Sequence, residues 1–152
     1  MSMNSSNGCA GSACLPLPEQ LRSGLLTAQA IAALAFARLS VAAIPFGRWR
    51  DTLGGAGAER EFEAPNVDAR HFAAHVERAA KLLPLSTRCL PRAMALSWIL
   101  RRNKVGHTVV FAVRPASLRN AHDRLHAWVE VAGEKVIGDL PGPWIETLRL
   151  GS

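Results

Sequence analysis

Three residues whose types together can break an amide bond lie in the second half of the chain: Cys89, His126 and Asp139. In such chemistry a thiol is the nucleophile, an imidazole takes up and returns its proton, and a carboxylate orients the imidazole. The three follow one another in the order Cys, His, Asp. Whether they can act together depends on the elements that carry them.

Cys89 is predicted to begin a helix. Pro91 fits a first turn, because the opening N–H groups of a helix have no partner within it. The basic stretch at residues 101–104, followed by Gly106 as a stop, indicates the far end. Between these points apolar residues recur at helical spacing, at Leu90, Met94, Leu96, Trp98, Ile99 and Leu100.

This position would make the Cys89 sulfur reactive. The positive end of the helix dipole, its unpaired N–H groups and the neighbouring Arg88 and Arg92 favour thiolate over thiol. Against this, free cysteine is among the most buried residue types, and a lone cysteine at a helix start is more often structural than catalytic. The catalytic interpretation therefore depends on the downstream residues.

His126 lies in a stretch that is predicted to form a β-hairpin. Residues 125–131 alternate, with His126, Trp128 and Glu130 on one face and apolar residues on the other. The sequence A-G-E supplies a turn, and residues 135–139 form the predicted returning strand.

The turn decides whether Asp139 reaches His126. A loop of Ala132 and Gly133 places the two residues directly across the strand pair, and a loop of Gly133 and Glu134 places Asp139 diagonal to His126. Both alternatives put the imidazole and the carboxylate on one sheet face, within about 5–8 Å between backbone positions. Only a three-residue loop without a bulge would send Asp139 to the opposite face.

Two other carboxylates compete for the orienting role. Glu130 shares the face of His126 but lies further along the same strand, about 13 Å away at ~3.3 Å per residue. Asp123 lies shortly before His126 in a predicted loop, whose mobility disfavours it. Asp139 is therefore the preferred assignment.

These stretches resemble a known family. C-L-P-R-A-M-A-L-S-W-I-L-R-R-N-K-V-G and H-A-W-V-E-V-A-G-E-K-V-I-G-D are similar to segments of the leader peptidases of lasso-peptide maturation, the microcin-processing branch of the transglutaminase-like cysteine protease superfamily. The earlier A-R-L-S-V-A-A-I-P-F-G-R-W-R-D-T-L-G resembles the N-terminal segment of that family. The likeness covers roughly residues 20–140.

The resemblance implies a fold, a mechanism and partners. The fold is α+β and papain-related, with N-terminal helices and the Cys89 helix packed on a small antiparallel sheet. Cys89 is implied as the nucleophile, His126 as the base and Asp139 as the orienting acid of an endopeptidase that removes a leader peptide, without metal or organic cofactor. The implied partners are the precursor peptide, a separate leader-binding protein and an ATP-dependent macrolactam cyclase.

Two other function classes stay open. One is a different acyl-transfer enzyme of the same superfamily, such as an amidase or a transglutaminase. The other is a non-catalytic peptide-binding module that carries the same residues.

Composition sets the broad class. At 152 residues with 49% hydrophobic content, the chain is expected to fold as one domain over residues 20–152. Residues 1–19 are small and polar and are expected to be disordered. The three cysteines, two of them Cys9 and Cys14 in this tail, argue against a disulfide scaffold and favour a reducing cytoplasm.

The net charge of +6 invites a nucleic-acid function, but the Lys and Arg residues are scattered, without a run of five or a nucleic-acid motif. An acidic peptide partner fits this charge equally well. We therefore predict no nucleic-acid partner.

Residues 20–43 are predicted to form an apolar helix, which could be a membrane span, a signal peptide or a helix covered by the core or by a partner. Gln29 and Arg38 interrupt the apolar stretch that a span requires. The preceding tail is too long, and not basic enough, for a secretory signal. A covered helix is therefore favoured, with contact to a membrane surface as the alternative.

The middle of the chain carries a short helix near residues 48–50, a break at 53–57, a linker at 58–65 and a helix from Asn66 to about residue 83. On that helix His71 and His75 stand four residues apart, a spacing that can bind metal. Neighbouring basic residues place both on the expected solvated face. No metal site is therefore predicted.

Residues 107–113 are apolar on both faces and predict a central strand. The following loop, residues 114–124, is a plausible rim of the substrate cleft. His107 and His122 are interpreted as surface or structural residues. After Asp139 a turn and a short amphipathic piece are expected, with Trp144 either covering the edge of the cleft or closing the core, of which the second is commoner.

Overall fold

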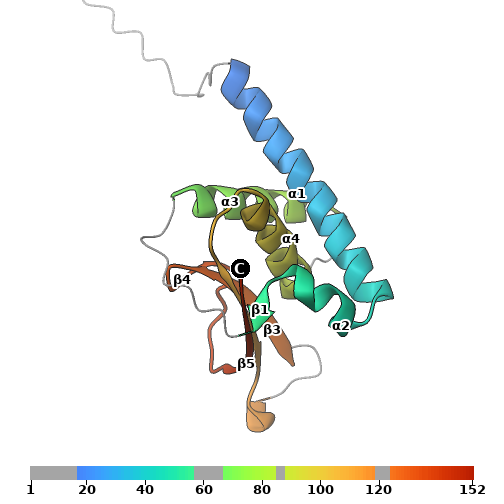
Figure 1. Ribbon diagram of the computed structural model, residues 1–152, viewed down its shortest axis with the longest axis vertical. Coiled ribbons are helices and arrows are strands. Elements are labelled where there is room, and N and C mark those ends of the chain that lie inside the picture. The colour runs from blue at the N-terminus through green and yellow to red at the C-terminus, as the bar shows by residue number, and fades with distance from the viewer. Residues whose placement is uncertain (1–16, 57–66, 85–87, 119–123) are drawn as a thin grey trace, which may run out of the picture.

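The computed structural model describes residues 17–56, 67–84, 88–118 and 124–152. It has four α-helices in this part of the chain: α1 (Leu17–Ala43), α2 (Phe46–Trp49), α3 (Val67–Leu82) and α4 (Cys89–Arg102). The strands are β1 (Gly55–Ala56), β2 (Thr108–Val113), β3 (Leu125–Val131), β4 (Glu134–Ile137) and β5 (Ile145–Gly151). Short 3-10 turns lie at Arg50–Thr52 and Ala116–Leu118. The predicted α+β class is confirmed (Figure 1).

Several sequence predictions fall outside the described residues. They concern the tail before residue 17 with Cys9 and Cys14, the linker at 58–65, the helix cap Asn66, and the loop segment that carries His122 and Asp123.

The strands form a single antiparallel sheet in the order β1-β5-β2-β3-β4. β2 is the central strand, as its apolar residues on both faces predicted. β5 was not predicted as a strand, yet it lies between β1 and β2. Its alternation places Leu148 and Leu150 against the core, but exposed residues at its start weaken that pattern in the sequence.

The helices pack together on one face of the sheet (Figure 1). α4 contributes Met94, Leu96 and Leu100 with no exposed surface, because it is enclosed by α1, α3 and the strands β2 and β3. A second, smaller cluster of Val110, Ala112 and Trp128, with Trp144 packed against it, lies apart from this core. The core thus fixes the start of α4 relative to β3.

The end of α4 differs in detail from the prediction. The residue in the left-handed conformation just after the helix is Lys104, with φ 57°, and not the predicted stop Gly106. The Val105 N–H bonds to the Leu100 carbonyl at 2.9 Å, so the turn is closed before Gly106 is reached.

α1 is buried on one side only. Ala30, Leu34 and Ala37 pack with no exposed surface, because they follow helical spacing toward α3 and α4. By length and composition alone the stretch Glu19–Ala43 could span a membrane, with 22% of its most apolar window buried. Because a core helix can meet the same criterion, the absence of a membrane span stays a prediction.

Candidate active site

Cys89 is the first residue of α4, as predicted. Arg88 before it is extended, with φ −66° and ψ 166°, so the helix starts abruptly at the thiol. The Cys89 Sγ atom lies 3.8 Å from the carbonyl oxygen of Leu125, the first residue of β3. The positive end of the helix is thus positioned at the start of the strand that carries His126.

His126 is buried, with 2% of its surface exposed, and its Nε2 atom lies 2.6 Å from the carbonyl oxygen of Gly138. A carbonyl oxygen only accepts hydrogen bonds, so Nε2 carries the hydrogen in this contact. In the neutral ring Nδ1 is then the nitrogen that can accept a proton. The contact therefore selects one tautomer of the base.

Aromatic rings hold the imidazole from the sides. The ring of Trp144 lies 4.8 Å from that of His126, inclined by 32°, and the ring of Trp128 lies 5.8 Å away. The guanidinium of Arg114 lies 4.6 Å from the centre of the Trp144 ring. Trp144 therefore covers the base as well as the smaller core cluster.

Gly138 brings its carbonyl to His126 through a conformation that suits glycine. Its φ is +82°, and a Cβ there would lie 2.8 Å from the Ala127 carbonyl oxygen and 3.0 Å from the Trp128 Cβ. Another side chain would therefore push the returning segment away from β3. Sequence reasoning missed this residue, although a glycine inside a strand pattern can signal such a close approach.

The strand register differs from the prediction by one residue. Val131 pairs with Glu134, which confirms the loop of Ala132 and Gly133, but Val129 pairs with Ile137 after an irregularity in the ladder. A bulge with one extra residue changes which side chains share a face. The prediction that this loop would put Asp139 directly across from His126 was therefore wrong.

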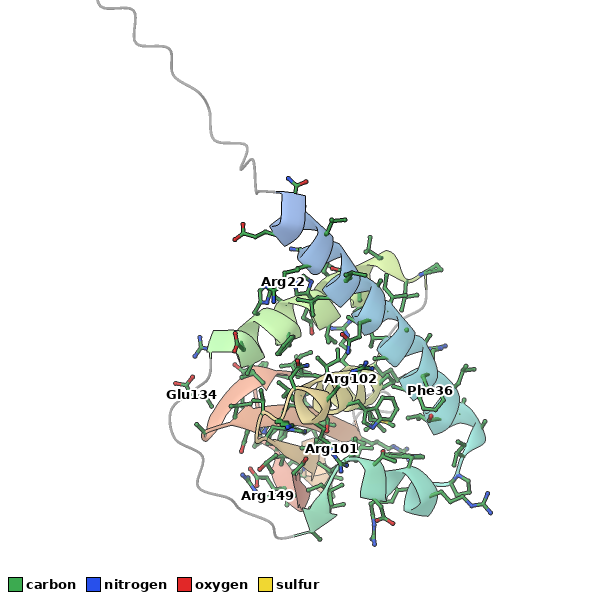
Figure 2. The ribbon with its side chains drawn as sticks, turned by 45° about the horizontal axis from the view of Figure 1, so that its top comes forward. Arg22, Phe36, Arg101, Arg102, Glu134 and Arg149 are labelled. Atoms are coloured by element: carbon green, nitrogen blue, oxygen red, sulfur yellow. The ribbon has the colours of Figure 1, made fainter. Side chains whose placement is uncertain are left out.

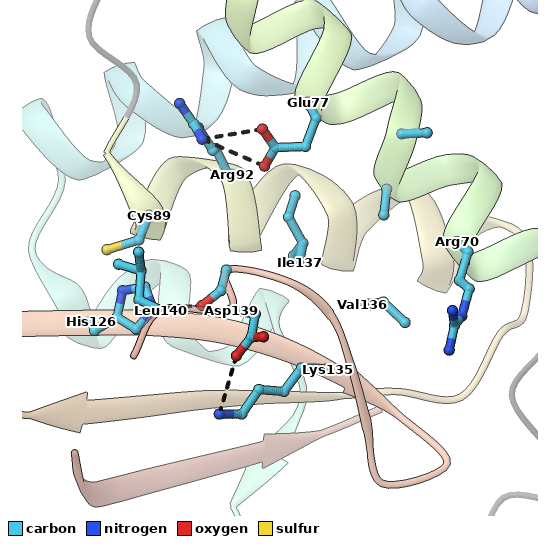
Figure 3. A pocket seen from close by; sticks show the side chains of 13 residues that line it. Arg70, Glu77, Cys89, Arg92, His126, Lys135, Val136, Ile137, Asp139 and Leu140 are labelled. Carbon is cyan, nitrogen blue, oxygen red and sulfur yellow. Dashed lines mark hydrogen bonds and ion pairs between the residues drawn. The ribbon is translucent and has the colours of Figure 1, made fainter. Parts of the chain in front are cut away.

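Asp139 nevertheless lines the same cavity as Cys89 and His126. Its carboxylate is 81% exposed and lies 3.8 Å from the Nζ atom of Lys135 (Figure 3). The role of Asp139 as the orienting acid stays a prediction. The observed hydrogen-bond partner of the His126 Nε2 atom is its neighbour, the Gly138 carbonyl.

Two cavities meet at Cys89. The Asp139 cavity, of about 620 Å³, lies between α3, the start of α4 and the segment after β4. The Arg124 cavity, of about 690 Å³, is lined by Arg38, Arg88 and Arg124 together with Trp144. Both cavities include Cys89, His126 and Leu140, so a bound chain that passes the sulfur could occupy both.

The other described histidines serve different purposes. His107 has no exposed surface, and its ring contacts the Ser97 hydroxyl at 2.7 Å and the Val105 carbonyl at 2.9 Å, which confirms a structural position. His75 is buried against Thr27 and His71, contrary to the expectation of a solvated face. The described residues include no group of three His, Cys, Asp or Glu that could hold a metal ion.

Comparison with known proteins identifies the wider family. The family model described as the transglutaminase-like superfamily matches residues 28–146, from within α1 to the beginning of β5. No curated protein and no solved structure gives a significant match to the chain.

Proposed function

The chain belongs to the transglutaminase-like superfamily, and on this basis we propose that it is a cysteine endopeptidase that removes the leader from a ribosomally made lasso-peptide precursor. The observation that supports the chemistry is the placement of Cys89 at a helix start and of His126 in the same cavities. The substrate assignment rests on the similarity of the two segments that carry these residues to leader peptidases of lasso-peptide maturation.

The first step is thiol activation. His126 Nδ1 takes the proton of the Cys89 thiol, because Nε2 already carries the hydrogen that faces Gly138. The sulfur then attacks the scissile carbonyl carbon, and the carbonyl double bond opens to an oxyanion. The imidazolium that forms keeps its Nε2 hydrogen on the Gly138 carbonyl, which stabilises the charge.

The oxyanion develops at the start of α4. The Cys89 backbone N–H lies at the positive end of this helix, where the first N–H groups have no partner inside the helix. Pro91 supplies no N–H in this first turn, so the N–H groups without a partner inside the helix belong to Arg88, Cys89 and Leu90.

Collapse of the intermediate breaks the C–N bond. The amine leaves with the proton from the His126 Nδ1 atom, and the acyl group remains on Cys89 as a thioester. Water then attacks the thioester carbon while the imidazole takes up its proton. The C–S bond breaks, the leader leaves as a carboxylic acid, and the Cys89 sulfur takes the proton back from the imidazolium. We propose that Asp139 contributes its negative charge to this cavity as the orienting acid.

A separate leader-binding protein is proposed as the partner of α1. The large apolar side chains Leu21, Leu25, Phe36 and Leu39 on this helix are 60–70% exposed. Figure 2 shows α1 running past the other elements, with Phe36 on it. Several large apolar side chains exposed on one helix favour a protein or membrane contact. The inner face of α1 is packed on α3 and α4, so only its outer face is left for a partner. We propose that a protein covers this outer face, in a reducing cytoplasm.

The proposal is tested with the purified chain, a synthetic precursor peptide and a leader-binding protein encoded beside it. Mass spectrometry is expected to show the precursor separated into leader and core, much faster with the binding protein than without it. The same cleavage with Cys89→Ala would refute the cysteine mechanism. Acyl transfer to an added amine in place of water would instead indicate a transglutaminase.

A further inference from the structure

The charges around Cys89 are arranged differently in its two cavities. In the Asp139 cavity, Arg92 lies 3.2 Å from a Glu77 carboxylate oxygen, and Lys135 lies 3.8 Å from Asp139. Arg70, which also lines it, pairs with Glu134 (Figure 3 shows the first two pairs). Each basic residue of this cavity thus has a carboxylate partner within the chain.

The Arg124 cavity carries three arginines from three separate elements: Arg38 from α1, Arg88 just before α4 and Arg124 just before β3. Among the described residues that line it, none is acidic. The side chains of Arg88 and Arg124 are exposed, and neither forms an ion pair or a hydrogen bond within the part of the chain that the structure describes. Arg88 and Arg124 therefore present positive charge that the described lining does not neutralise.

The remaining lining shows how a ligand would sit. Leu90, Pro91 and Leu125 supply apolar walls, and Trp144 joins this cavity to the His126 ring that it covers. Such a mixture suits a peptide segment that carries a carboxylate, because guanidinium groups bind carboxylates through two parallel hydrogen bonds. A small anion would leave the apolar walls in contact with water.

We propose that the Arg124 cavity binds an acidic side chain of the peptide substrate, close to the bond that Cys89 attacks. This inference rests on the proposed peptidase function and adds a substrate class to it. A peptide that passes the sulfur enters the cavity directly, since Cys89 and His126 belong to its lining. The acidic residue therefore lies near the scissile bond, because Arg88 directly precedes Cys89 and lines the same cavity.

The first test compares cleavage of charged and neutral peptides. A degenerate peptide library read by mass spectrometry identifies a cleaved sequence, and pairs that differ by Glu or Gln at one position are then assayed. Arg88→Gln and Arg124→Gln are expected to lower kcat/KM about tenfold for the Glu peptide, the loss of one charged hydrogen bond. For the Gln peptide, Arg124→Gln is expected to change kcat/KM by no more than about twofold. Arg88→Gln should lower kcat/KM for both peptides, and more for the Glu peptide, because Arg88 also favours the Cys89 thiolate.

Two further variants control this test. Arg48→Gln on α2 removes an exposed arginine outside both cavities and should leave both peptides unaffected. Arg124→Glu should reverse the preference toward a peptide with Lys at that position. With Arg124→Gln, equal losses for the Glu and Gln peptides, or no loss for either, would overturn the proposal.

A binding assay separates this proposal from the peptidase function. Two fluorescein-labelled pools of random ten-residue peptides, one rich in Glu and the other in Gln, are titrated with Cys89→Ala, and anisotropy is measured. One outcome is that the Glu pool binds more tightly, in a way that depends on Arg88 and Arg124, while the parental chain cleaves nothing. That result would support the acidic-side-chain site and contradict the peptidase function. Cleavage without any charge preference would contradict the cavity alone.

Discussion

His107 and His126 are two buried histidines of the same sheet region, with 0% and 2% of their surface exposed. Each ring has one nitrogen at a backbone carbonyl: Val105 at 2.9 Å from His107 Nδ1, and Gly138 at 2.6 Å from His126 Nε2. Burial and a selected tautomer therefore do not distinguish a structural histidine from a candidate base.

The difference lies in the surroundings of each ring. The Nε2 atom of His107 lies 2.7 Å from the Ser97 hydroxyl inside the core, and His107 lines neither cavity. His126 lines both cavities that contain Cys89. The comparison indicates that access to a nucleophile, and not burial itself, marks the residue that can carry a proton during a reaction.

The largest effect is expected from Cys89→Ala. Removal of the sulfur should lower the cleavage rate on the order of a thousandfold or more, because no covalent intermediate can form. Since Cys89 is only partly buried, the thermal midpoint should change little. Mass spectrometry of the precursor reports the first quantity and circular dichroism the second.

Ser97→Ala is the matched control, because it should lower stability and leave the cleavage rate unchanged. It leaves the buried His107 ring without its hydroxyl partner and should cost about 1–3 kcal/mol of unfolding free energy. The rate per folded molecule should stay close to that of the parental chain. If Cys89→Ala cleaved the precursor at the parental rate, the access of His126 to Cys89 would no longer distinguish it from His107.

Substitution of the two histidines tests the comparison directly. His126→Gln should lower the rate about 10²- to 10⁴-fold, because general acid–base catalysis is lost. His107→Gln should lower the thermal midpoint and leave the rate of the folded fraction nearly unchanged. A large rate loss in His107→Gln at temperatures where it is fully folded would show that both histidines serve the reaction.

Asp139→Asn is expected to lower the rate about tenfold or more, but less than His126→Gln, since an orienting group is partly dispensable. Because the Asp139 carboxylate is exposed, the substitution should change the unfolding free energy little. Gly138→Ala is the informative partner variant, because a Cβ would displace the carbonyl that contacts His126. If Gly138→Ala loses rate and Asp139→Asn does not, the carbonyl alone orients the imidazole.

The smallest effect concerns pH. Burial lowers the pKa of His107 below 6.5; the Val105 carbonyl raises this pKa in part, and the charge of Arg101 lowers it further. Burial also lowers the pKa of His75, and the charges of His71 and Arg78 lower it further. The unfolded chain then binds protons at a higher pH than the folded chain. The unfolding free energy should be constant above about pH 6.5 and should fall as the pH drops below it.

Urea titrations from pH 8 to pH 5 measure this dependence. His107→Phe should flatten the slope, since one of the two contributing groups is removed. A slope of opposite sign would contradict the buried neutral state of both rings.

Local patterns predicted much of this molecule. Helical spacing and the early Pro91 placed Cys89 at a helix start, and alternation placed His126 on a strand, because each signal lies within one element. Those two signals were sufficient to suggest the nucleophile and the base. The central position of β2 followed in the same way from a short apolar run.

Features that depend on contacts between distant segments were not predicted. The bulge in the β3–β4 pair shifted Asp139, since one extra residue alters a register without leaving a clear signal in composition. Arg38, Arg88 and Arg124 line one cavity because three elements pack together. No single segment of the sequence encodes this packing. β5 was missed because its partners lie far away along the chain.

The place of β5 between β1 and β2 has a consequence for the order of events during synthesis. The long-range pairs of β5 with residues 55–56 and 108–113 cannot form until residue 151 has emerged from the ribosome. Until then the edge of β2 that faces β5 is open, and the segment that carries Trp144 has no strand after it to fix it beside His126. A nascent chain should therefore complete its active site only after β5 has been translated, so that the proposed protease stays inactive up to that point.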